Sequence, residues 1–324
     1  MRVLLVKLSS LGDVIHNLPV VSDLARAHPG VEIDWAVETP YAELAAMHPA
    51  VKNVLPLPMR RLKKQWWSAE AWRVFAAGRS RIAGQRYDHV LDTQGLIKSS
   101  WVASWADGPV AGYSASCARE PLAARFYDQC VDVPRELHAV TRNRQLAAKA
   151  LGYTPANAID YGITAPARSI SWRPAGPYVV LLHATSRADK MWPDSNWIEL
   201  GTQLQGRGVD VVLPWGNNPE RDTSQRLAKA LRGAIVPPAM SLTDAATVLG
   251  QARAVVGVDT GLAHLAVALS RLTIGLYITT QPSLTGLFGK PNAINIGGGS
   301  QDAQCVPGVE AVWSALNAAT NFAQ

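Results

Sequence analysis

The chain has 324 residues, of which 48% are hydrophobic and 17% are charged. This composition excludes a disordered chain, and the length suits two domains of roughly 150 residues each. No apolar run approaches the ~18–20 residues of a membrane-spanning helix, and the first residues lack a signal-peptide pattern. Three widely spaced cysteines, Cys117, Cys130 and Cys305, show no metal or redox spacing. We therefore expect a cytoplasmic protein with reduced thiols.

The charge balance of the sequence favours an anionic partner. Thirty-one Lys and Arg residues against 25 Asp and Glu residues leave a formal net charge of +6. A positive surface attracts phosphate groups, nucleic acid or an acidic membrane face, and the net charge does not choose among them.

In the first half, short apolar runs alternate with amphipathic stretches, which is typical of a parallel sheet covered by helices. The expected strands are residues 2–7, 32–37, 53–57, 87–92 and 109–112. The expected helices are residues 68–84, 96–105 and 138–151. A Pro-, Ala- and Ser-rich stretch follows at 154–178, and we interpret it as the connection between domains, with the boundary after residue 160.

The second half begins the same pattern again with "YVVLLHATSRADK" (178–190), a strand followed by a hydroxyl-rich loop and a helix. Further strands are expected at 209–213, 253–258 and 272–277. The expected helices are 193–207, 219–231, 241–250, 260–269 and 307–322. The sequence therefore predicts an α/β fold of two Rossmann-like, doubly wound parallel-sheet domains that face a central cleft. Ligands bind beyond the carboxyl ends of such strands, which selects the loops after residues 7, 183 and 258.

The first of these loops reads "KLSSLGDVIHNLP" (7–19). Gly12 allows tight backbone geometry, and Asp13 lies where a strand is followed by a helix. An acidic residue in a first helical turn stabilises the helix dipole and caps free N–H groups. Capping and a functional role are therefore both open for Asp13.

The second loop reads "HATSRADKMWP" (183–193). Thr185 and Ser186 offer hydroxyl groups just past a strand, and Lys190 offers a cation before the next helix. This cluster of donors favours an anion site, against the alternative of ordinary loop residues and a solvated lysine.

The third loop lies within "VVGVDTGLAHLAVAL" (255–269). The strand ends at Asp259, Thr260 is placed to cap the next helix, and Gly261 lets its backbone approach a ligand. The free N–H groups of that helix start suit a phosphate group, with His264 one turn further on the same side. The alternative is a simple cap with a structural histidine.

A basic segment, "RRLKKQWW" (60–67), combines four cations with two indoles. It is either a solvated loop or a surface for anionic lipid headgroups or a nucleic-acid strand. Further positive charge in the same half comes from Arg119, Arg125, His138, Arg142 and Arg144.

Several site types are missing from the sequence. There is no phosphate-binding G-x-x-x-x-G-K-[ST] loop and no G-x-G-x-x-G after a strand. An Asp-x-Asp pair, an H-E-x-x-H helix and clustered His and Cys residues are also absent, so we expect no metal.

Six segments, taken together, carry a resemblance to a known family. They are "KLSSLGDVIHNLP", "DTQGLIKS" (92–99), "AREPLAARFY" (118–127), "HATSRADKMWP", "LPWG" (213–216) and "VDTGLAHL" (258–265). In this order they resemble the ADP-heptose:lipopolysaccharide heptosyltransferases, glycosyltransferase family 9, over nearly the whole chain. The resemblance implies the GT-B architecture, with the acceptor on the first domain and the nucleotide sugar on the second. It also implies an inverting transfer of heptose from ADP-heptose to the Kdo residue of Kdo-lipid A, with no cofactor and no metal.

The resemblance also assigns roles to individual residues. Asp13 is expected to be the catalytic base. The residues expected to bind the ADP-heptose donor are Thr185, Ser186, Lys190, Glu220, Met240, Asp259, Thr260, Gly261 and His264. Among them Glu220 is expected at the ribose and Met240 at the adenine. The residues expected to bind the acidic acceptor are Ser10, Arg60, Arg61, Lys63, Lys64, Lys98, Arg119 and His138.

One loop departs from the family pattern. Where the family commonly has a Gly-Pro-Thr-Asp-Pro-like loop after a strand, this chain reads Ile278-Thr279-Thr280-Gln281-Pro282 and lacks the carboxylate. This loss puts a donor-sugar contact at that position in doubt.

The resemblance further implies a monomer on the cytoplasmic face of the inner membrane that binds no nucleic acid. The last helix of the family commonly packs back on the first domain, which we expect of residues 307–322. Two other classes of protein fit the pattern less well. A bilobal binding protein would normally carry an export signal, and a nucleic-acid binder would not explain Asp13 or the loops suited to a diphosphate.

Overall fold

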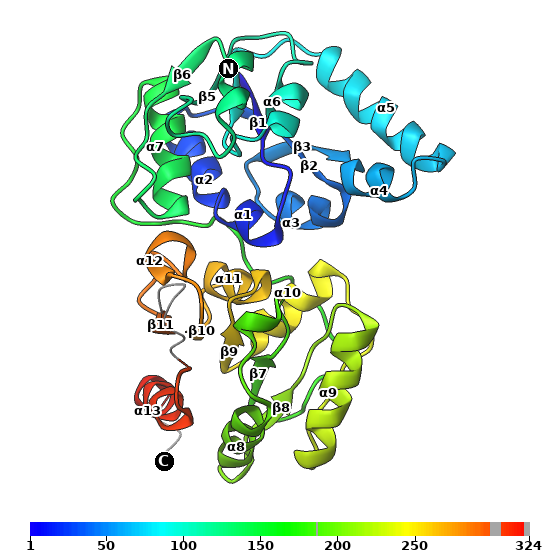
Figure 1. The fold of residues 1–324 in the computed structure, drawn as a ribbon, viewed down its shortest axis with the longest axis vertical. Helices are drawn as coiled ribbons and strands as arrows, with labels where there is room; N and C mark the ends of the chain where they lie inside the picture. The colour runs from blue at the N-terminus through cyan, green and yellow to red at the C-terminus, as the bar shows by residue number, and fades with distance from the viewer. Residues whose placement is uncertain (186, 299–305, 321–324) are drawn as a thin grey trace. The chain divides into compact units, whose positions relative to one another are not determined.

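The computed structural model describes residues 1–185, 187–298 and 306–320. Contacts within the chain divide it into two units, Met1–Ile163 and Thr164–Gln324. Each unit is built around its own sheet (Figure 1). Ser186 and Cys305 lie outside the described residues. No helix in the described ranges is long and apolar enough to cross a membrane.

The first unit is organised around β1, which pairs in parallel with both β2 and β4. The sheet order is β3-β2-β1-β4-β5-β6. Its strands are β1 (Arg2–Val6), β2 (Glu32–Glu38), β3 (Val51–Leu57), β4 (His89–Asp92), β5 (Val110–Tyr113) and β6 (Gln129–Val131). Val3 to Val6 are fully buried, as expected for a parallel strand covered on both faces.

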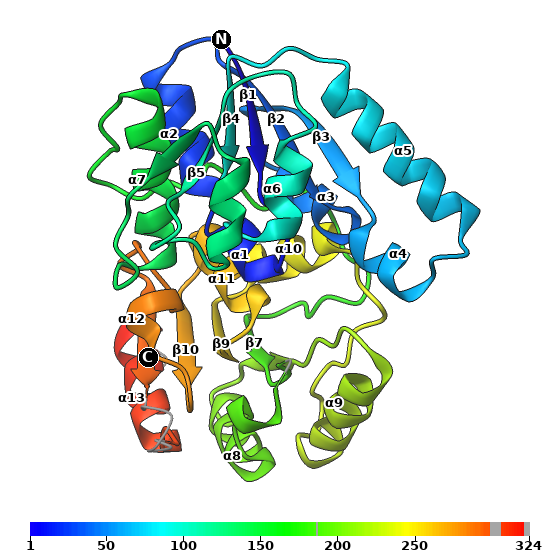
Figure 2. The same cartoon turned by 45° about the horizontal axis from the view of Figure 1, so that its top comes forward.

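Helices cover both faces of this sheet. They are α1 (Leu11–Ile15), α2 (Leu18–Ala27), η1 (Thr39–Tyr41), α3 (Ala42–Ala46), α4 (Met59–Lys64), α5 (Ala69–Ala83), α6 (Ile97–Ala103), η2 (Pro121–Phe126) and α7 (Ala139–Leu151). Residues of α5, α6 and η2 share one hydrophobic core with β1 and β3. Helices α2 and α7 pack together on the opposite side from α5 (Figure 2).

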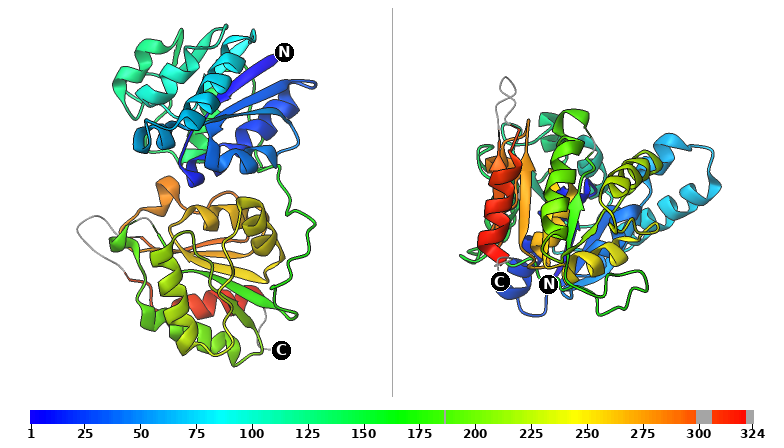
Figure 3. Two further views of the ribbon diagram at one scale, coloured as in Figure 1. Left: turned by 90° about the vertical axis from the view of Figure 1, so that its right-hand side faces the viewer. Right: turned by 90° about the horizontal axis from the view of Figure 1, so that it is seen from below.

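The second unit contains a parallel sheet of order β11-β10-β9-β7-β8. Helices flank this sheet (Figure 3). Its strands are β7 (Tyr178–Leu182), β8 (Asp210–Val212), β9 (Ala254–Val258), β10 (Thr273–Tyr277) and β11 (Ala293–Gly297). Its helices are η3 (Ala188–Lys190), α8 (Asp194–Gln205), α9 (Asn218–Ala230), α10 (Leu242–Gln251), α11 (Gly261–Ala268), α12 (Pro282–Thr285) and α13 (Val309–Thr320). Each unit thus combines a parallel sheet with helices, which confirms the predicted α/β fold class.

The last helix of the described chain, α13, packs within the second unit. The buried side chains of α13, Val312 and Leu316, belong to the hydrophobic core of the second unit. The helix contacts α8, β10 and β11 of that unit. The buried face of α13 thus covers the sheet of its own unit, and packing of this helix on the first domain stays a prediction.

Strands β6 and β11 were not predicted. Both lie at the edge of a sheet, and most of their residues are exposed or half-buried. An edge strand needs no continuous apolar run, so its sequence gives a weak signal.

Candidate active site

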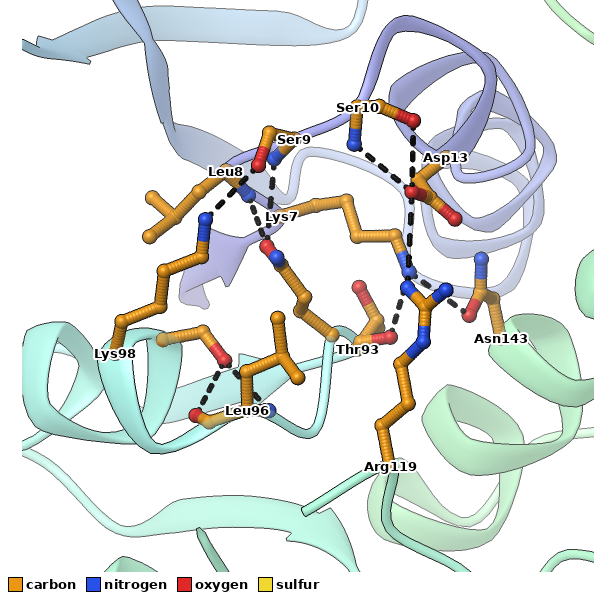
Figure 4. A network of polar contacts seen from close by, with 12 residues as sticks. Lys7, Leu8, Ser9, Ser10, Asp13, Thr93, Leu96, Lys98, Arg119 and Asn143 are labelled. Atoms are coloured by element: carbon orange, nitrogen blue, oxygen red, sulfur yellow. Dashed lines mark hydrogen bonds and ion pairs between the residues drawn. The ribbon is translucent and has the colours of Figure 1, made fainter. Parts of the chain in front are cut away.

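The loop after β1 is held in place by the neighbouring strand β4. Gln94, two residues past β4, accepts hydrogen bonds through Oε1 from the N–H of Leu8 at 2.7 Å and of Ser9 at 3.4 Å. Lys98 Nζ donates to Ser9 Oγ at 3.0 Å (Figure 4). The loop that carries Asp13 is thus fixed at the carboxyl edge of the sheet, where ligands bind in such folds.

Asp13 does cap its helix, but with one oxygen. Its Oδ2 accepts from the N–H of Ser10 at 2.8 Å and from Ser10 Oγ at 3.0 Å (Figure 4). Within the described residues, the hydrogen bonds to this carboxylate fall on Oδ2, and the side chain is 27% exposed. Oδ1 is therefore available to accept a proton, and capping and base chemistry are compatible at the same residue.

Lys7 was missed by sequence reasoning. Its ammonium is buried and donates to the Thr93 carbonyl at 2.7 Å and to Asn143 Oδ1 at 3.4 Å (Figure 4). Burial lowers its pKa to about 8, against the opposing effect of the Asp13 and Asp92 carboxylates. The available signal was a lysine that directly follows the apolar run Val3–Val6 of β1.

Among the predicted acceptor residues, Arg119 and His138 differ in placement. Arg119 is 65% exposed, and its Nη1 lies 3.9 Å from Asp13 Oδ2. His138 is 6% exposed, accepts the Val140 N–H through Nδ1 at 3.2 Å, and packs edge-on against His16. His138 is thus a buried helix cap of α7, and its predicted contact with the acceptor stays a prediction.

The four cations of the predicted basic segment lie in α4, and they line an open surface depression of about 710 Å³ together with Gln65. Arg60 Nη1 donates to Tyr41 Oη at 2.9 Å. Arg61 pairs with Glu70 at 2.6 Å. Arg60 and Arg61 are thus oriented by neighbouring side chains, and Lys63 and Lys64 project as exposed charges.

In the second unit, the sequence-distant Lys190 and Asp259 form an ion pair. Lys190 Nζ lies 2.6 Å from Asp259 Oδ2, with side chains that are 15% and 14% exposed. Two residues after Lys190, Trp192 is buried against Trp197 and donates to the Pro307 carbonyl at 2.7 Å. This anchor holds the short helix η3, and with it the lysine, beside the carboxyl end of β9.

The Asp259 carboxylate is the centre of this group. Burial alone would raise its pKa, but hydrogen bonds from His264 and Lys190 and the Lys190 charge outweigh it and lower the pKa to about 2. His264 Nε2 lies 3.9 Å from Asp259 Oδ1. The ionised form contributes stability at neutral pH, which is lost as the pH falls from 3.8 toward about 2.

The start of α11 lies beside this ion pair. Thr260 is the N-cap residue with an extended backbone, and Gly261 is the first helical residue. In the described chain the Thr260 hydroxyl makes no capping hydrogen bond. The first-turn N–H groups are thus free of a side-chain cap, as an anion site requires. Thr185 reaches the same place, since its Oγ1 donates to the Asp259 carbonyl at 3.0 Å.

The two residues predicted at the nucleoside lie elsewhere in the same unit. Glu220 is in the first turn of α9 and accepts the Gly216 N–H at 2.7 Å. Its other oxygen accepts from Asn217 Nδ2 at 2.7 Å. Met240 is half-buried just before α10. Ser186, also predicted to bind the donor, lies outside the described residues.

The loop that departs from the family pattern, residues 278–282, contributes hydroxyl groups in place of a carboxylate. Thr280 Oγ1 donates to Asp259 Oδ2 at 3.2 Å, and Thr279 Oγ1 donates to Asp189 Oδ2 at 3.1 Å. Both threonines therefore bind acidic residues of neighbouring loops, and Thr280 joins the Lys190–Asp259 pair. In the described ranges, no group of three or more His, Cys, Asp or Glu residues is placed to hold a metal ion.

Comparison with known proteins gives consistent similarities. Residues 75–312 match the model of glycosyltransferase family 9 (heptosyltransferase). The chain is 46% identical over 312 residues to lipopolysaccharide heptosyltransferase 1 of Pseudomonas aeruginosa, covering 95% of this chain and 86% of the relative. It is 44% identical over 292 residues to lipopolysaccharide heptosyltransferase 1 of Escherichia coli K12, covering 90% and 92%. A solved structure of the E. coli heptosyltransferase WaaC with ADP has a TM-score of 0.89 at 39% identity, covering 98% and 99%.

Proposed function

The chain belongs to glycosyltransferase family 9, the heptosyltransferases, and from this premise we propose that it adds heptose to the Kdo residue of Kdo-lipid A. It is a heptosyltransferase I enzyme that transfers heptose from ADP-heptose in lipopolysaccharide core biosynthesis. The observation that carries the proposal is Asp13, whose Oδ2 caps the helix while no hydrogen bond within the described residues falls on Oδ1.

The proposed mechanism is a single inverting displacement at the anomeric carbon of the heptose. The acceptor hydroxyl loses its proton to Asp13 Oδ1 as its oxygen attacks, and the bond from the anomeric carbon to the ADP oxygen breaks. Negative charge then gathers on the departing diphosphate. Lys190 and the N–H groups at the start of α11 are the groups we assign to stabilise that charge.

The acceptor side is assigned to the cations of the first unit. Arg60, Arg61, Lys63 and Lys64 surround an open depression, and Lys98 binds Ser9 in the loop of Asp13. Carboxylates of Kdo and phosphates of lipid A are suited to such a surface. We further propose that the protein is a monomer at the cytoplasmic face of the inner membrane, where its lipid acceptor is made, and binds no nucleic acid.

The function is tested by ADP release. Purified protein is mixed with ADP-heptose, with and without a Kdo-bearing lipid acceptor, and ADP is measured over time. The proposal requires ADP release that depends on the acceptor. Release at equal rates without the acceptor, or with lipid A that lacks Kdo, would contradict it.

We expect catalysis to survive removal of divalent metal ions. Lys190 and the α11 N–H groups supply the positive charge that the leaving diphosphate needs, so a metal ion has no required role. The measurement is the rate of ADP release in excess EDTA. Loss of turnover that Mg²⁺ or Mn²⁺ restores would overturn this expectation.

Replacing Lys190 with methionine is expected to weaken ADP binding about 10- to 100-fold, because a charge-assisted hydrogen bond contributes about 1.5–3 kcal/mol. The measurement is Kd for ADP by calorimetry. Arg187→Met is the matched control, since Arg187 is 62% exposed and pairs with Asp189. Equal Kd values for Lys190→Met and the wild type would assign Lys190 only to the structural ion pair with Asp259.

A further inference from the structure

Helices α5 and α6 of the first unit share a cluster of aromatic rings at the surface. Phe75 lies at its centre, with ring centroids 5.6 Å from Trp72, 6.3 Å from Trp101 and 5.4 Å from Trp105. Trp101 and Trp105 are themselves 4.8 Å apart. The four rings thus form one continuous group that joins two helices.

The neighbouring element η2 carries two further exposed apolar side chains. Helix α6 packs against η2, which carries Leu122 and Phe126. Exposed fractions are 50% for Trp72, 43% for Trp101, 53% for Leu122 and 38% for Phe126. We call Trp72, Phe75, Trp101, Trp105, Leu122 and Phe126 the aromatic face. Exposed apolar side chains gathered on packed elements in this way mark an interaction site.

The aromatic face is not what attaches α5 to its sheet. The buried residues of α5 are Ala71, Gly78 and Ile82. A Cβ added at Gly78 would lie 2.6 Å from Leu57 Cδ2, so the helix backbone approaches β3 closely on that side. Trp72 is half exposed and its Nε1 donates to the Trp66 carbonyl at 2.7 Å, so the exposed part of its ring remains available to a partner outside the unit.

Three arginines lie on the elements that carry the aromatic face. Arg73, Arg79 and Arg125 are exposed, and in the described part of the chain none of them forms an ion pair. The Arg79 guanidinium lies 5.8 Å from the centroid of the Trp105 ring. Two acidic residues of these elements are engaged, because Glu70 binds Arg61 and Glu120 accepts the Ile97 N–H at 2.7 Å.

We propose that the aromatic face docks into the headgroup layer of an anionic lipid bilayer. Indole rings prefer this layer because they are apolar with one polar N–H, and the arginines on the same elements attract lipid phosphates. A second copy of this chain is disfavoured as the occupant, because like charges would meet across the interface. This inference rests on the proposed function, because an enzyme with a lipid acceptor has to work at a membrane surface.

The test measures binding of the full chain to vesicles without donor or acceptor. Wild-type protein should sediment with vesicles of phosphatidylethanolamine and phosphatidylglycerol, and less with phosphatidylcholine alone. The triple variant Trp72→Ser, Leu122→Ser, Phe126→Ser should bind anionic vesicles roughly tenfold or more weakly, because apolar area drives interfacial binding. The ring contacts of Phe75 with Trp101 and Trp105 stay intact in this variant, and its unfolding temperature checks the fold.

A matched control replaces exposed apolar residues of the second unit, Leu284→Ser with Val306→Ser, and should bind like the wild type. Turnover of a deacylated, water-soluble acceptor should be unchanged in the triple variant, so a failure of docking is distinct from a failure of catalysis. Undiminished vesicle binding by the triple variant overturns the proposal. It is also overturned if the wild type sediments with neither kind of vesicle. A third contrary outcome is that the triple substitution abolishes self-association of the protein and leaves its vesicle binding unchanged.

Discussion

Replacing Asp13 with asparagine is expected to lower kcat roughly 100-fold or more, with Kd for ADP nearly unchanged. An amide retains an oxygen that can accept the hydrogen bonds from the Ser10 N–H and Oγ, so the helix cap is preserved. The amide does not take a proton from the acceptor hydroxyl. The variant therefore separates base chemistry from capping, which Asp13→Ala would remove together. Single-turnover rates with saturating substrates measure the chemical step.

The control for the cap is Ser10→Ala, which removes one of the two hydrogen bonds to Asp13 Oδ2 and keeps the carboxylate. Its unfolding temperature should fall slightly, by an amount typical of one exposed hydrogen bond. Near-normal turnover by folded Asp13→Asn protein would leave only the capping role for Asp13.

Replacing Arg60, Arg61, Lys63 and Lys64 with serine is expected to raise KM for a Kdo-bearing lipid acceptor several-hundred-fold. Each cation near an anionic surface contributes about 1 kcal/mol at most, so four charges bring the limit to roughly three orders of magnitude. Arg61 is partly engaged by Glu70, which keeps the effect below that limit. Kd for ADP should stay nearly constant, since these residues belong to the first unit and the donor groups to the second.

Salt provides the internal check on this second prediction. The Debye length is about 8 Å at physiological ionic strength and becomes shorter in high salt, which weakens attraction between exposed charges. The defect of the variant relative to the wild type should therefore shrink in high salt, where the wild type is also impaired. A control with the same change of net charge replaces exposed cations of the second unit, Arg207, Lys229, Arg232 and Arg253, with serine. Equal acceptor KM values in the wild type and the fourfold serine variant of α4 would mean that this segment is only a solvated helix. A parallel loss of ADP binding would indicate a damaged fold.

Structural placement changes how some predicted residues are interpreted. His138 carries no sequence feature that separates a surface imidazole from a buried cap, and its 6% exposure follows from packing of α7. Lys7 was overlooked because a lysine at the end of a strand usually reaches solvent. Here the Thr93 carbonyl and Asn143, which lie 86 and 136 residues away in the sequence, enclose its ammonium.

The sequence by itself determined the fold class, the family and the loops that follow β1, β7 and β9. These features rest on local signals, because apolar runs, turn residues and short segments such as "VDTGLAHL" are contiguous in the chain. Contacts between distant residues were decided only by the tertiary structure. The Lys190–Asp259 pair joins residues 69 apart, the aromatic face joins two helices, and α13 packs on its own sheet. Such contacts depend on how strands are ordered and helices are packed, which residue periodicity does not encode.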